Sequence, residues 1–486
     1  MATDTIAARR LADLVGDFDR DPAYVGLADA LRELIGDGRV GYGTRLPSER
    51  DLTATLGVSR TTVTRAYAVL RETGYAEARQ GAGTFTRLPG GPVRARDRAL
   101  TPGTGGAGTL DLVCAAATAP PGIAAHYQRA VEELPAHLGT SGYYPAGLPE
   151  LQAAIAATYE ARGLPTVPEQ IIVTPGALAA TAVVGAAVAG PRDRILIDSP
   201  TYPNATQALR TGGARLAVAP LEPDGWDLDA VGAVLTRQRP RAAYLMPDFH
   251  NPTGLVLPAA DRSALAERLR AAGTVPVVDE AHQALRLDGQ EPLTPFAALD
   301  PRTITVGSAS KSIWGGLRLG WIRSPRDRVE ELTLARIGLD LGAPVLEQLV
   351  LARILADGAD ELIAANRARL RAQRDALVAA LGEHLPEWTF RVPTGGMALW
   401  CRLPHGDSTT LVDLAERHGV MLAPGPVFAP AGGLNRHLRL IYTLPPDDLH
   451  EAVRRIAGAW AELGATGPGA GGRGRRRTSP GPVLVA

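Results

Sequence analysis

The chain has 486 residues, of which 45% are hydrophobic and 21% are charged. This length exceeds one ordinary domain of roughly 100 to 200 residues, and this composition excludes a wholly disordered chain. The 51 basic and 51 acidic residues cancel, which excludes a globally basic nucleic-acid binder but leaves room for a local basic surface.

The N-terminal region, residues 22–86, carries the pattern of several short elements. Apolar residues at a 3.6-residue period predict a helix over residues 23–35. Ser48 and Ser59 are typical N-caps and predict two short helices across a tight glycine turn, the second over residues 60–73. The residues that follow predict a small β-hairpin. This order of elements is typical of a winged helix-turn-helix.

The remaining chain divides by composition into a linker, a large unit and a tail. Residues 87–110 are rich in Gly, Pro and Arg and predict a flexible linker. Residues 111–464 alternate apolar runs with helical stretches, which predicts an α/β unit with a largely parallel sheet. Strands are expected at residues 170–174, 194–197, 242–246, 275–278 and 303–306, and helices at residues 151–162 and 261–272. Residues 465–486 predict a disordered tail.

The cysteine content and the apolar pattern bear on where the chain resides. Cys114 and Cys401 lie too far apart in the sequence to suggest a disulfide framework or a multi-cysteine metal site, and no metal site is expected. We find no signal peptide and no apolar run of about 18 residues. We therefore expect a cytoplasmic protein with no membrane partner.

The start of the second short helix has the composition of a DNA-reading element. It begins with hydroxyl and guanidinium side chains, which can bond to bases and phosphates. Residues 39–87 contain eight arginines against four acidic residues, an excess that suits a phosphate-facing surface. The alternative is a plain structural corner, since helix-turn-helix patterns also occur without DNA.

The run GTRLPSERDLTATLGVSRTTVTRAYAVLRETGYAEARQGAGTF resembles the GntR-type winged helix along its length. The resemblance implies that the unit binds double-stranded DNA. The residues expected to face DNA are Arg50, Ser59, Arg60, Thr61 and Thr62, with Arg65 further along the same helix. Gln80 and Gly81, at the wing tip, would reach the minor groove.

Lys311 is the only lysine in the chain. Arginine can replace lysine in most surface roles, but it cannot form an imine because its guanidinium stays protonated. A single retained lysine therefore indicates an imine-forming role, and the alternative is a surface accident. Ser308, Ser310 and Arg318 lie close in sequence and would supply hydroxyls and a fixed positive charge for a phosphate.

Further polar residues follow the predicted strands, where ligands bind in parallel sheets. Asp279 closes an apolar run, and a carboxylate there can pair with a pyridinium nitrogen. Asn251 follows another strand and could donate to the phenolic oxygen of the same ring. Ala177 and Leu178 open a helix whose N–H groups form an anion site. Tyr202 could stack on the ring.

Each of these features alone is weak, because each also occurs in turns and helix caps. Together, their order and type resemble the fold type I aminotransferases, the aspartate aminotransferase superfamily. The resemblance implies that Lys311 forms a Schiff base with pyridoxal 5'-phosphate (PLP), and that Asp279 and Asn251 bind the ring. Tyr143 or Tyr144 would reach a phosphate in the neighbouring subunit, which implies a homodimer. Arg439 is a candidate clamp for the carboxylate of a substrate or effector.

One position departs from the family pattern. The family usually has a tyrosine two or three residues after the strand-end aspartate, and it donates to the phenolic oxygen. This chain has His282 there. The histidine either takes the tyrosine's place or packs without touching the cofactor, and the sequence leaves both readings open.

A GntR-type reader joined to an aminotransferase-like unit is the architecture of the MocR family of transcriptional regulators. This resemblance implies a PLP-dependent regulator that senses PLP, another B6 vitamer or an amine through an external aldimine and binds promoter half-sites. The alternative is a working aminotransferase with an appended DNA-binding domain. We favour the regulator, because an enzyme alone has no need of a recognition helix.

Overall fold

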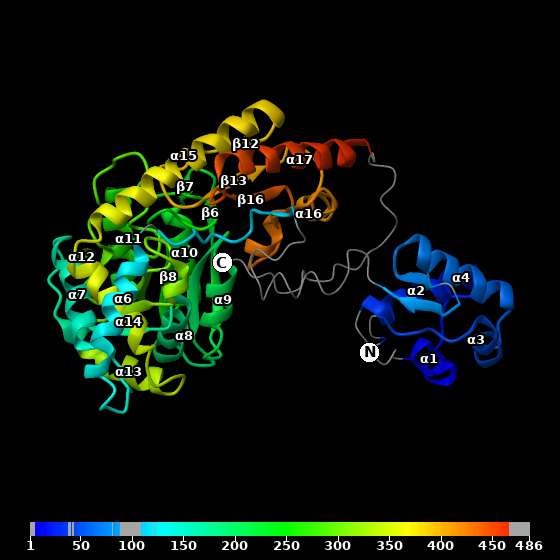
Figure 1. Ribbon diagram of the computed structural model, residues 1–486, viewed down its shortest axis with the longest axis horizontal. Helices are drawn as coiled ribbons and strands as arrows, with labels where there is room; N and C mark the ends of the chain where they lie inside the picture. Colours follow the sequence, from blue (N-terminus) through cyan, green and yellow to red (C-terminus); the bar gives the residue numbers. More distant parts are fainter. Residues whose placement is uncertain are drawn as a thin grey trace. The chain divides into compact units, whose positions relative to one another are not determined.

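The computed structural model describes residues 5–36, 40, 43–79, 81–87, 108–120 and 122–465. The chain forms two compact units, residues 1–104 and 105–486, and each is described by itself. Figure 1 shows the helices and strands of both units. The predicted fold class, a winged helix-turn-helix followed by an α/β unit, is confirmed. Gln80 and most of the predicted linker and tail lie outside the described residues.

The N-terminal unit consists of short helices followed by a β-hairpin. Its elements are α1 (Ala8–Val15), α2 (Ala23–Gly36), α3 (Glu49–Leu56), α4 (Arg60–Glu72), β1 (Ala76–Arg79) and β2 (Gly83–Thr86). Strands β1 and β2 pair antiparallel, as expected for the wing. The apolar faces of all four helices meet in one core, which includes Leu11, Leu31, Leu52 and Tyr67.

Two serine caps fix the ends of the helix-turn-helix. The Ser48 hydroxyl accepts a hydrogen bond from the Asp51 N–H at 3.2 Å, and the Ser59 hydroxyl accepts one from the Thr62 N–H at 3.0 Å. Between the two helices, Gly57 has φ +64°, a left-handed conformation that glycine adopts without steric cost. The predicted caps and the turn are therefore confirmed.

Helix α1 was not predicted, although it belongs to the same core. Leu11 and Val15 of this helix are buried. Upstream of α1, the Ile6 N–H donates to the Arg45 carbonyl at 3.2 Å, next to a β-bridge between Thr5 and Arg45. The chain before residue 22 thus covers the winged helix. An eight-residue helix gives too short a periodic pattern to stand out in a sequence.

The second unit is built on a sheet of eight strands. They are β4 (Ile171–Thr174), β5 (Arg194–Ser199), β6 (Arg215–Glu222), β7 (Gly225–Trp226), β8 (Ala242–Leu245), β9 (Val275–Asp279), β10 (Ile304–Ser308) and β11 (Gly320–Arg323). Their order is β4-β11-β10-β9-β8-β5-β6-β7. Strands β5, β6, β8, β9 and β10 run parallel, while β11 is antiparallel to β4 and β10, and β7 to β6. The prediction of a largely parallel sheet is confirmed.

Helices cover both faces of this sheet. The helices of this part are α6 (Ile123–Glu133), α7 (Pro149–Glu160), α8 (Ala177–Val188), α9 (Pro203–Leu209), α10 (Leu228–Gln238), α11 (Ala259–Ala271), α12 (Phe296–Leu299), α13 (Val329–Ile337) and α14 (Val345–Ala356). Ile195 and Ile197 of β5 pack in one core with α8, α9 and α13, whereas Leu196 packs in another with α10 and α11. Successive side chains of a strand point to opposite faces, so each apolar run must be covered twice.

The predicted strands and helices are confirmed with small shifts at their ends. Each strand end lies within two residues of its predicted position, and β10 continues to Ser308. Helices α7 and α11 begin two residues earlier than predicted. Pro149 is the first residue of α7, and Pro258 precedes α11. Proline is favoured at helix starts, and a search for apolar periodicity does not detect this signal.

Residues 360–465 form what we call the small lobe. It contains β12 (Thr389–Phe390), β13 (Ala398–Arg402), β15 (Ala423–Pro424) and β16 (His437–Ile441), with α15 (Asp360–His384), α16 (Ser408–Arg417) and α17 (Pro446–Ala465). These strands make an antiparallel sheet in the order β12-β13-β16-β15, and the helices pack against it. None of the described helices in the chain combines the length and apolarity that crossing a bilayer requires.

The chain enters the second unit along the small lobe. Strand β3 (Leu110–Asp111) pairs in parallel with β14 (Val420–Met421). The Leu110 N–H donates to the Gly419 carbonyl at 2.9 Å. The segment that follows the linker is thus fixed to the small lobe before it reaches the large sheet.

Candidate functional site

The ends of three strands meet at one edge of the large sheet. Asp279, the last residue of β9, pairs with Val306 of β10. Ser308, the last residue of β10, pairs with Gly320 of β11, which also pairs with Thr174 at the end of β4. The strand register therefore brings these residues together, although they lie far apart in the sequence. We call this region the strand-end site.

Asp279 is buried and held by two hydrogen bonds. One carboxylate oxygen accepts from the Tyr244 hydroxyl at 2.5 Å, and the other accepts from the Ala281 N–H at 2.8 Å. Burial raises the pKa of Asp279, while these hydrogen bonds and the charge of Lys311 act against that rise. A cationic group opposite the carboxylate would offset its burial. Tyr244 was missed in the sequence, although a hydroxyl inside an otherwise apolar strand could have marked it.

Lys311 points at the chain segment that follows β3. Its Nζ donates to the Ala115 carbonyl at 2.8 Å. Burial lowers the pKa of Lys311 to about 8, with Cys114 opposing and Arg439 reinforcing the shift. About a tenth of the amine is therefore uncharged at pH 7, far more than for an ordinary lysine, and this is the form that attacks a carbonyl.

An anion site lies at the start of α8. Gly176 precedes this helix with φ +100°, and a Cβ there would lie 3.0 Å from Nη2 of Arg318. The Arg318 guanidinium therefore lies against the helix start, where Ala177 and Leu178 present N–H groups of the first turn. A fixed cation and a helix N-terminus together suit a phosphate.

The two predicted serines lie at the end of the adjacent strand β10. Ser308 ends the strand, and its hydroxyl accepts from the Ser310 N–H at 3.2 Å. Through Gly320, the end of this strand is next to the end of β4, which leads into α8.

Arg439 is fully buried in β16 of the small lobe and contacts two segments. It donates from Nη1 to the Asn251 side-chain oxygen at 3.1 Å and from Nη2 to the Val113 carbonyl. Its Nε has no hydrogen-bond partner among the described residues. Burial lowers the pKa of Arg439 to about 9, so it remains a cation at neutral pH. A buried cation with an unused donor suits a ligand carboxylate.

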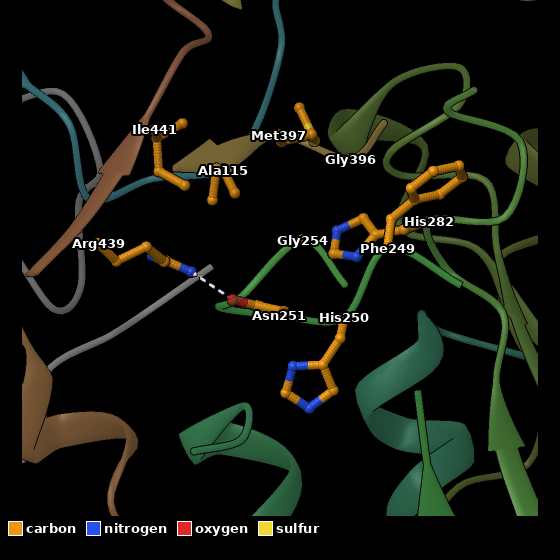
Figure 2. Close-up of a pocket in the computed structure, with 11 residues that line it drawn as sticks. Ala115, Phe249, His250, Asn251, Gly254, His282, Gly396, Met397, Arg439 and Ile441 are labelled. Carbon is orange, nitrogen blue, oxygen red and sulfur yellow. Dashed lines mark hydrogen bonds between the residues drawn. The ribbon is translucent and has the colours of Figure 1, made fainter. Parts of the chain in front are cut away.

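His282 faces a small pocket beside Arg439. Figure 2 shows His282, Asn251 and Arg439 around this pocket, with Ala115 and Met397 also lining it. The Nε2 atom of His282 is buried and has no hydrogen-bond partner among the described residues. Burial and the charge of Lys311 lower the pKa of His282 to about 3, so the ring is neutral. A contact between His282 and PLP stays a prediction.

The two predicted tyrosines differ in their placement. Tyr202 is packed near the strand-end site, and the charges of Arg439 and Asp279 act on its hydroxyl. That hydroxyl also accepts a hydrogen bond from Asn204 at 3.1 Å. Tyr144 instead lies in a loop, where its hydroxyl is 3.4 Å from Nδ1 of His137. Within one chain, the hydrogen bonds of the Tyr144 hydroxyl are thus to nearby residues, His137 and Thr140.

The predicted DNA-facing residues lie at the start of α3, along the first half of α4 and in the turn of the hairpin. The exposed ones are Arg50, Ser59, Arg60, Thr61, Arg65 and Gly81, and Thr62 is half-buried because it joins the cap. The Arg60 side chain is 78% exposed. Its Nε lies 3.8 Å from a carboxylate oxygen of Glu49, which makes a weak ion pair. Arg65 lies over the ring of Tyr24, with 4.4 Å between the guanidinium carbon and the ring centroid. Exposed guanidinium groups at a helix start suit a polyanion.

The residues at the strand-end site fit PLP. A strand-end carboxylate, a lysine with a lowered pKa and a phosphate cradle lie at the same sheet edge. The unused Nε of Arg439 and Nε2 of His282 are buried polar atoms that a ligand would satisfy. The fold and this site define a fold type I PLP-binding unit in a chain that also carries a winged helix.

Comparison with known proteins agrees with both halves of this description. The family model for aminotransferase class I and II matches residues 114–456, and the model for bacterial regulatory proteins of the gntR family matches residues 23–86. The probable rhizopine catabolism regulatory protein MocR of Rhizobium meliloti is 30% identical over 85% of this chain and 88% of its own length. The chain belongs to the MocR-type regulators within the aminotransferase class I and II family, and its cofactor is PLP.

Other relatives match the second unit alone. The 2-aminoadipate transaminase of Thermus thermophilus is 35% identical over 66% of this chain and 80% of its own length. The crystal structure of an alpha-aminoadipate aminotransferase from the same species, complexed with N-(5'-phosphopyridoxyl)-L-leucine, superposes with a TM-score of 0.68 at 30% identity. It covers 74% of this chain and 94% of that chain. The relatives named as transcriptional regulators cover more of the chain, which confirms the prediction of a GntR-type regulator fused to an aminotransferase domain.

Proposed function

We propose that this MocR-type regulator senses PLP, or an amino compound that reacts with bound PLP, and changes its promoter binding in response. The proposal rests on the segment that follows β3 at the start of the second unit. The Val113 and Ala115 carbonyls accept hydrogen bonds from Arg439 and Lys311. A ligand that binds Lys311 and Arg439 competes with these two carbonyls for the hydrogen-bond donors of both side chains. Ligand binding is therefore coupled to the position of this segment.

The proposed roles of the residues follow their chemistry. Lys311 attaches the cofactor, Asp279 pairs with the ring nitrogen, and Asn251 and His282 lie at the phenolic oxygen. Tyr202 stacks on the ring, and Arg439 takes an effector carboxylate. The phosphate is held by Ala177, Leu178, Ser308, Ser310 and Arg318, and by Tyr144 of the partner subunit.

PLP supplies an aldehyde that condenses with amines and a ring that withdraws electrons. The chain's residues set the conditions for that chemistry. Burial favours the uncharged Lys311 amine. Tyr244 fixes the orientation of the Asp279 carboxylate. A neutral His282 can accept a proton or a hydrogen bond at Nε2 but adds no charge, unlike a protonated histidine.

Binding to promoter DNA tests the proposal directly. The full chain, with and without PLP, is mixed with labelled DNA from its own and its neighbouring promoters in an electrophoretic mobility shift assay. We expect a specific shift that survives competitor DNA, and a several-fold change in affinity when PLP is added. Lys311→Ala should keep the shift and lose the response to PLP. Lys311→Arg keeps the charge and should behave in the same way.

Two results would contradict the proposal. The first is the lack of any specific shift with or without PLP. The second is a PLP response that persists in Lys311→Ala, because the cofactor would then act from another site. Once a shift is established, amino acids and B6 vitamers can be screened against the PLP-loaded chain by thermal shift to identify the effector.

A second candidate function is transamination. The lowered pKa of Lys311 and the buried Arg439 fork are the parts that an enzyme of this fold would use. Sustained turnover of an amino acid with an oxo acid would support this function. Reaction that stops after binding, or single slow half-reactions, would support a sensor.

We also propose that the protein is a cytoplasmic homodimer. A partner subunit would bring Tyr144 to a phosphate that its own chain does not offer it. Large apolar side chains are exposed on α6, near this loop, and in and after α13, namely Val131, Leu138, Tyr143, Leu334, Ile337, Leu339 and Leu341. Sedimentation of the purified chain as a monomer at micromolar concentration would contradict the dimer.

A further inference from the structure

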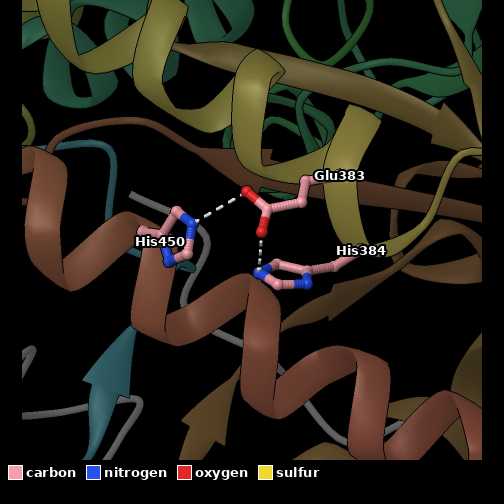
Figure 3. Close-up of side chains that lie close together, drawn as sticks. All are labelled: Glu383, His384 and His450. Atoms are coloured by element: carbon pink, nitrogen blue, oxygen red, sulfur yellow. Dashed lines mark hydrogen bonds and ion pairs between the residues drawn. The ribbon is translucent and has the colours of Figure 1, made fainter.

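Three side chains that can ligate a metal meet in the small lobe, outside the strand-end site. Glu383 and His384 end α15, and His450 lies in α17. Their ligand atoms all lie within 4.8 Å of one another. Figure 3 shows the Glu383 carboxylate between the two imidazole rings. Its oxygens are 3.2 Å from Nε2 of His450 and 3.8 Å from Nε2 of His384.

One of these nitrogens lacks a hydrogen bond. Nε2 of His384 is buried and has no hydrogen-bond partner among the described residues, because 3.8 Å to Glu383 is too long. Both Nε2 atoms face the same carboxylate, and the two rings are 5.0 Å apart at their centroids. The cluster thus offers a lone pair that an ion would satisfy and a negative charge to attract it.

The two helices that carry these ligands are fixed by apolar packing. Leu377 and Leu381 of α15 lie in the same core as Leu449 and Val453 of α17. Ligands on packed helices are held near their binding geometry before an ion arrives, which lowers the entropic cost of binding.

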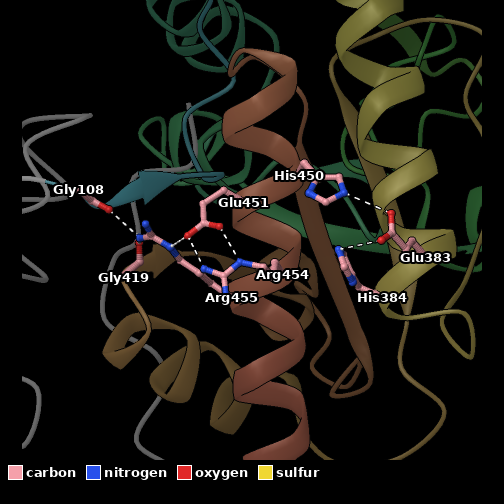
Figure 4. Close-up of polar contacts among 8 residues, drawn as sticks. All are labelled: Gly108, Glu383, His384, Gly419, His450, Glu451, Arg454 and Arg455. Carbon is pink, nitrogen blue, oxygen red and sulfur yellow. Dashed lines mark hydrogen bonds and ion pairs between the residues drawn. The ribbon is translucent and has the colours of Figure 1, made fainter.

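Helix α17 is also anchored next to His450. Glu451 accepts hydrogen bonds from Arg454 and Arg455, each at 2.7 Å. Arg455 in turn donates to the Gly108 carbonyl at 2.7 Å, as Figure 4 shows. Gly108 lies near the end of the predicted linker and is the first residue described in the second unit. One candidate ligand, His450, therefore lies on the helix that also holds the chain where it enters this unit.

We propose that Glu383, His384 and His450 bind a divalent transition-metal ion of the zinc type. Two imidazoles and one carboxylate suit Zn²⁺, Co²⁺ or Ni²⁺, whereas Mg²⁺ and Ca²⁺ prefer sets of oxygen ligands. Because Glu383 and His450 are partly exposed, water completes the coordination. The ion ties the end of α15 to α17. No metal site was expected from the sequence, because the fold brings these ligands together from two separate helices.

The test uses the untagged full chain without PLP, since PLP itself absorbs light and binds divalent ions. After treatment with a chelator and desalting, the chain is titrated with ZnCl₂ by isothermal calorimetry at neutral pH. We expect one saturable site per chain in the micromolar range or tighter. His450→Gln should weaken Zn²⁺ binding at least about tenfold, because it removes a direct ligand.

A matched control lies in the same lobe. His418 is 3.2 Å from a Glu462 oxygen, the same separation as between His450 and Glu383. Within the described residues, however, no third ligand completes a cluster there. His418→Gln should therefore leave Zn²⁺ binding unchanged. Equal weakening by both substitutions would overturn the assignment, as would unchanged binding in His450→Gln.

A second variant covers the case in which His450→Gln does not fold. Glu383→Gln keeps the side-chain shape and a hydrogen-bonding oxygen but removes the charge. ZnCl₂ should raise the thermal unfolding midpoint of the parent chain and of His418→Gln, and raise that of Glu383→Gln much less. An equal rise in all three would show that zinc acts elsewhere. The lack of any saturable Zn²⁺ binding by the parent chain would also overturn the proposal.

Discussion

The two units of this protein build their binding sites in opposite ways. In the winged helix, the candidate DNA contacts come from a short contiguous stretch around α3, α4 and the wing, and nearly all of them are exposed. In the PLP-binding unit, the site residues extend from Val113 to Arg439, and the central ones are buried. One site is therefore a property of a local motif, and the other is a property of the whole fold.

This difference determines how strongly the residues of each site act on one another. Water and dissolved ions screen the attraction between exposed guanidinium groups and phosphates. Each group therefore contributes modestly and independently to the affinity for DNA. Buried groups such as Asp279 and Lys311 shift each other's pKa values, so they act together. Substitutions should therefore have graded effects in the first unit and all-or-none effects in the second.

The largest effect is expected at Lys311. Lys311→Ala should lose the visible absorbance of bound PLP and any adduct fixed by borohydride, because no other lysine exists in the chain. Nonspecific DNA affinity should stay the same, since the winged helix is untouched. Absorbance spectra and mass analysis of the reduced protein measure the first effect. A reduced adduct mapped to any other side chain would contradict it.

The next largest effect is expected in the core of the N-terminal unit. Leu11 is fully buried, so Leu11→Ala should cost about 2 to 5 kcal/mol. The unfolding transition of the winged helix should move to lower temperature, and that of the PLP-binding unit should not. Calorimetry of the full chain measures both transitions. Asp13→Ala, at an exposed position of the same helix, is the control; equal effects of the two would show that α1 does not stabilise the unit.

A smaller effect is expected from pH. Because the pKa of Lys311 is lowered to about 8, the neutral amine increases as pH rises toward that value. The rate of PLP attachment should rise about tenfold per pH unit below pH 8 and level off above it. Stopped-flow absorbance measures the rate, with an N-acetylated lysine as the reference amine. A rate that still rises at the ordinary lysine pKa would show that the amine is not desolvated.

The smallest effect is expected at a single DNA contact. Arg60→Ala should weaken DNA binding about fivefold and reduce the slope of log affinity against log salt by about 0.9, the value for one phosphate. Absorbance of bound PLP should not change. Arg71→Ala, at the other end of α4, is the matched control. If both substitutions weaken binding equally, the effect comes from net charge rather than from the helix start.

The same contrast explains what could be predicted from the sequence. Ser48, Ser59 and the strand-end position of Asp279 follow from patterns a few residues long, and the structure confirms them. The hydrogen bonds from Tyr244 to Asp279 and from Arg439 to Val113 join residues far apart in the chain. No local pattern encodes such distances, so the partners of the predicted residues became known only from the fold.

The pairing of β3 with β14 has a mechanical consequence. Because of this pairing, strand β3, which follows the linker region, belongs to the same lobe that carries Arg439. A rotation of this lobe that brings Arg439 closer to a ligand would therefore also move strand β3, where the chain from the winged helix enters the lobe. In the homodimer proposed above, such a motion would change how far apart the two winged helices can reach along DNA, while the bases that each one recognises stay the same.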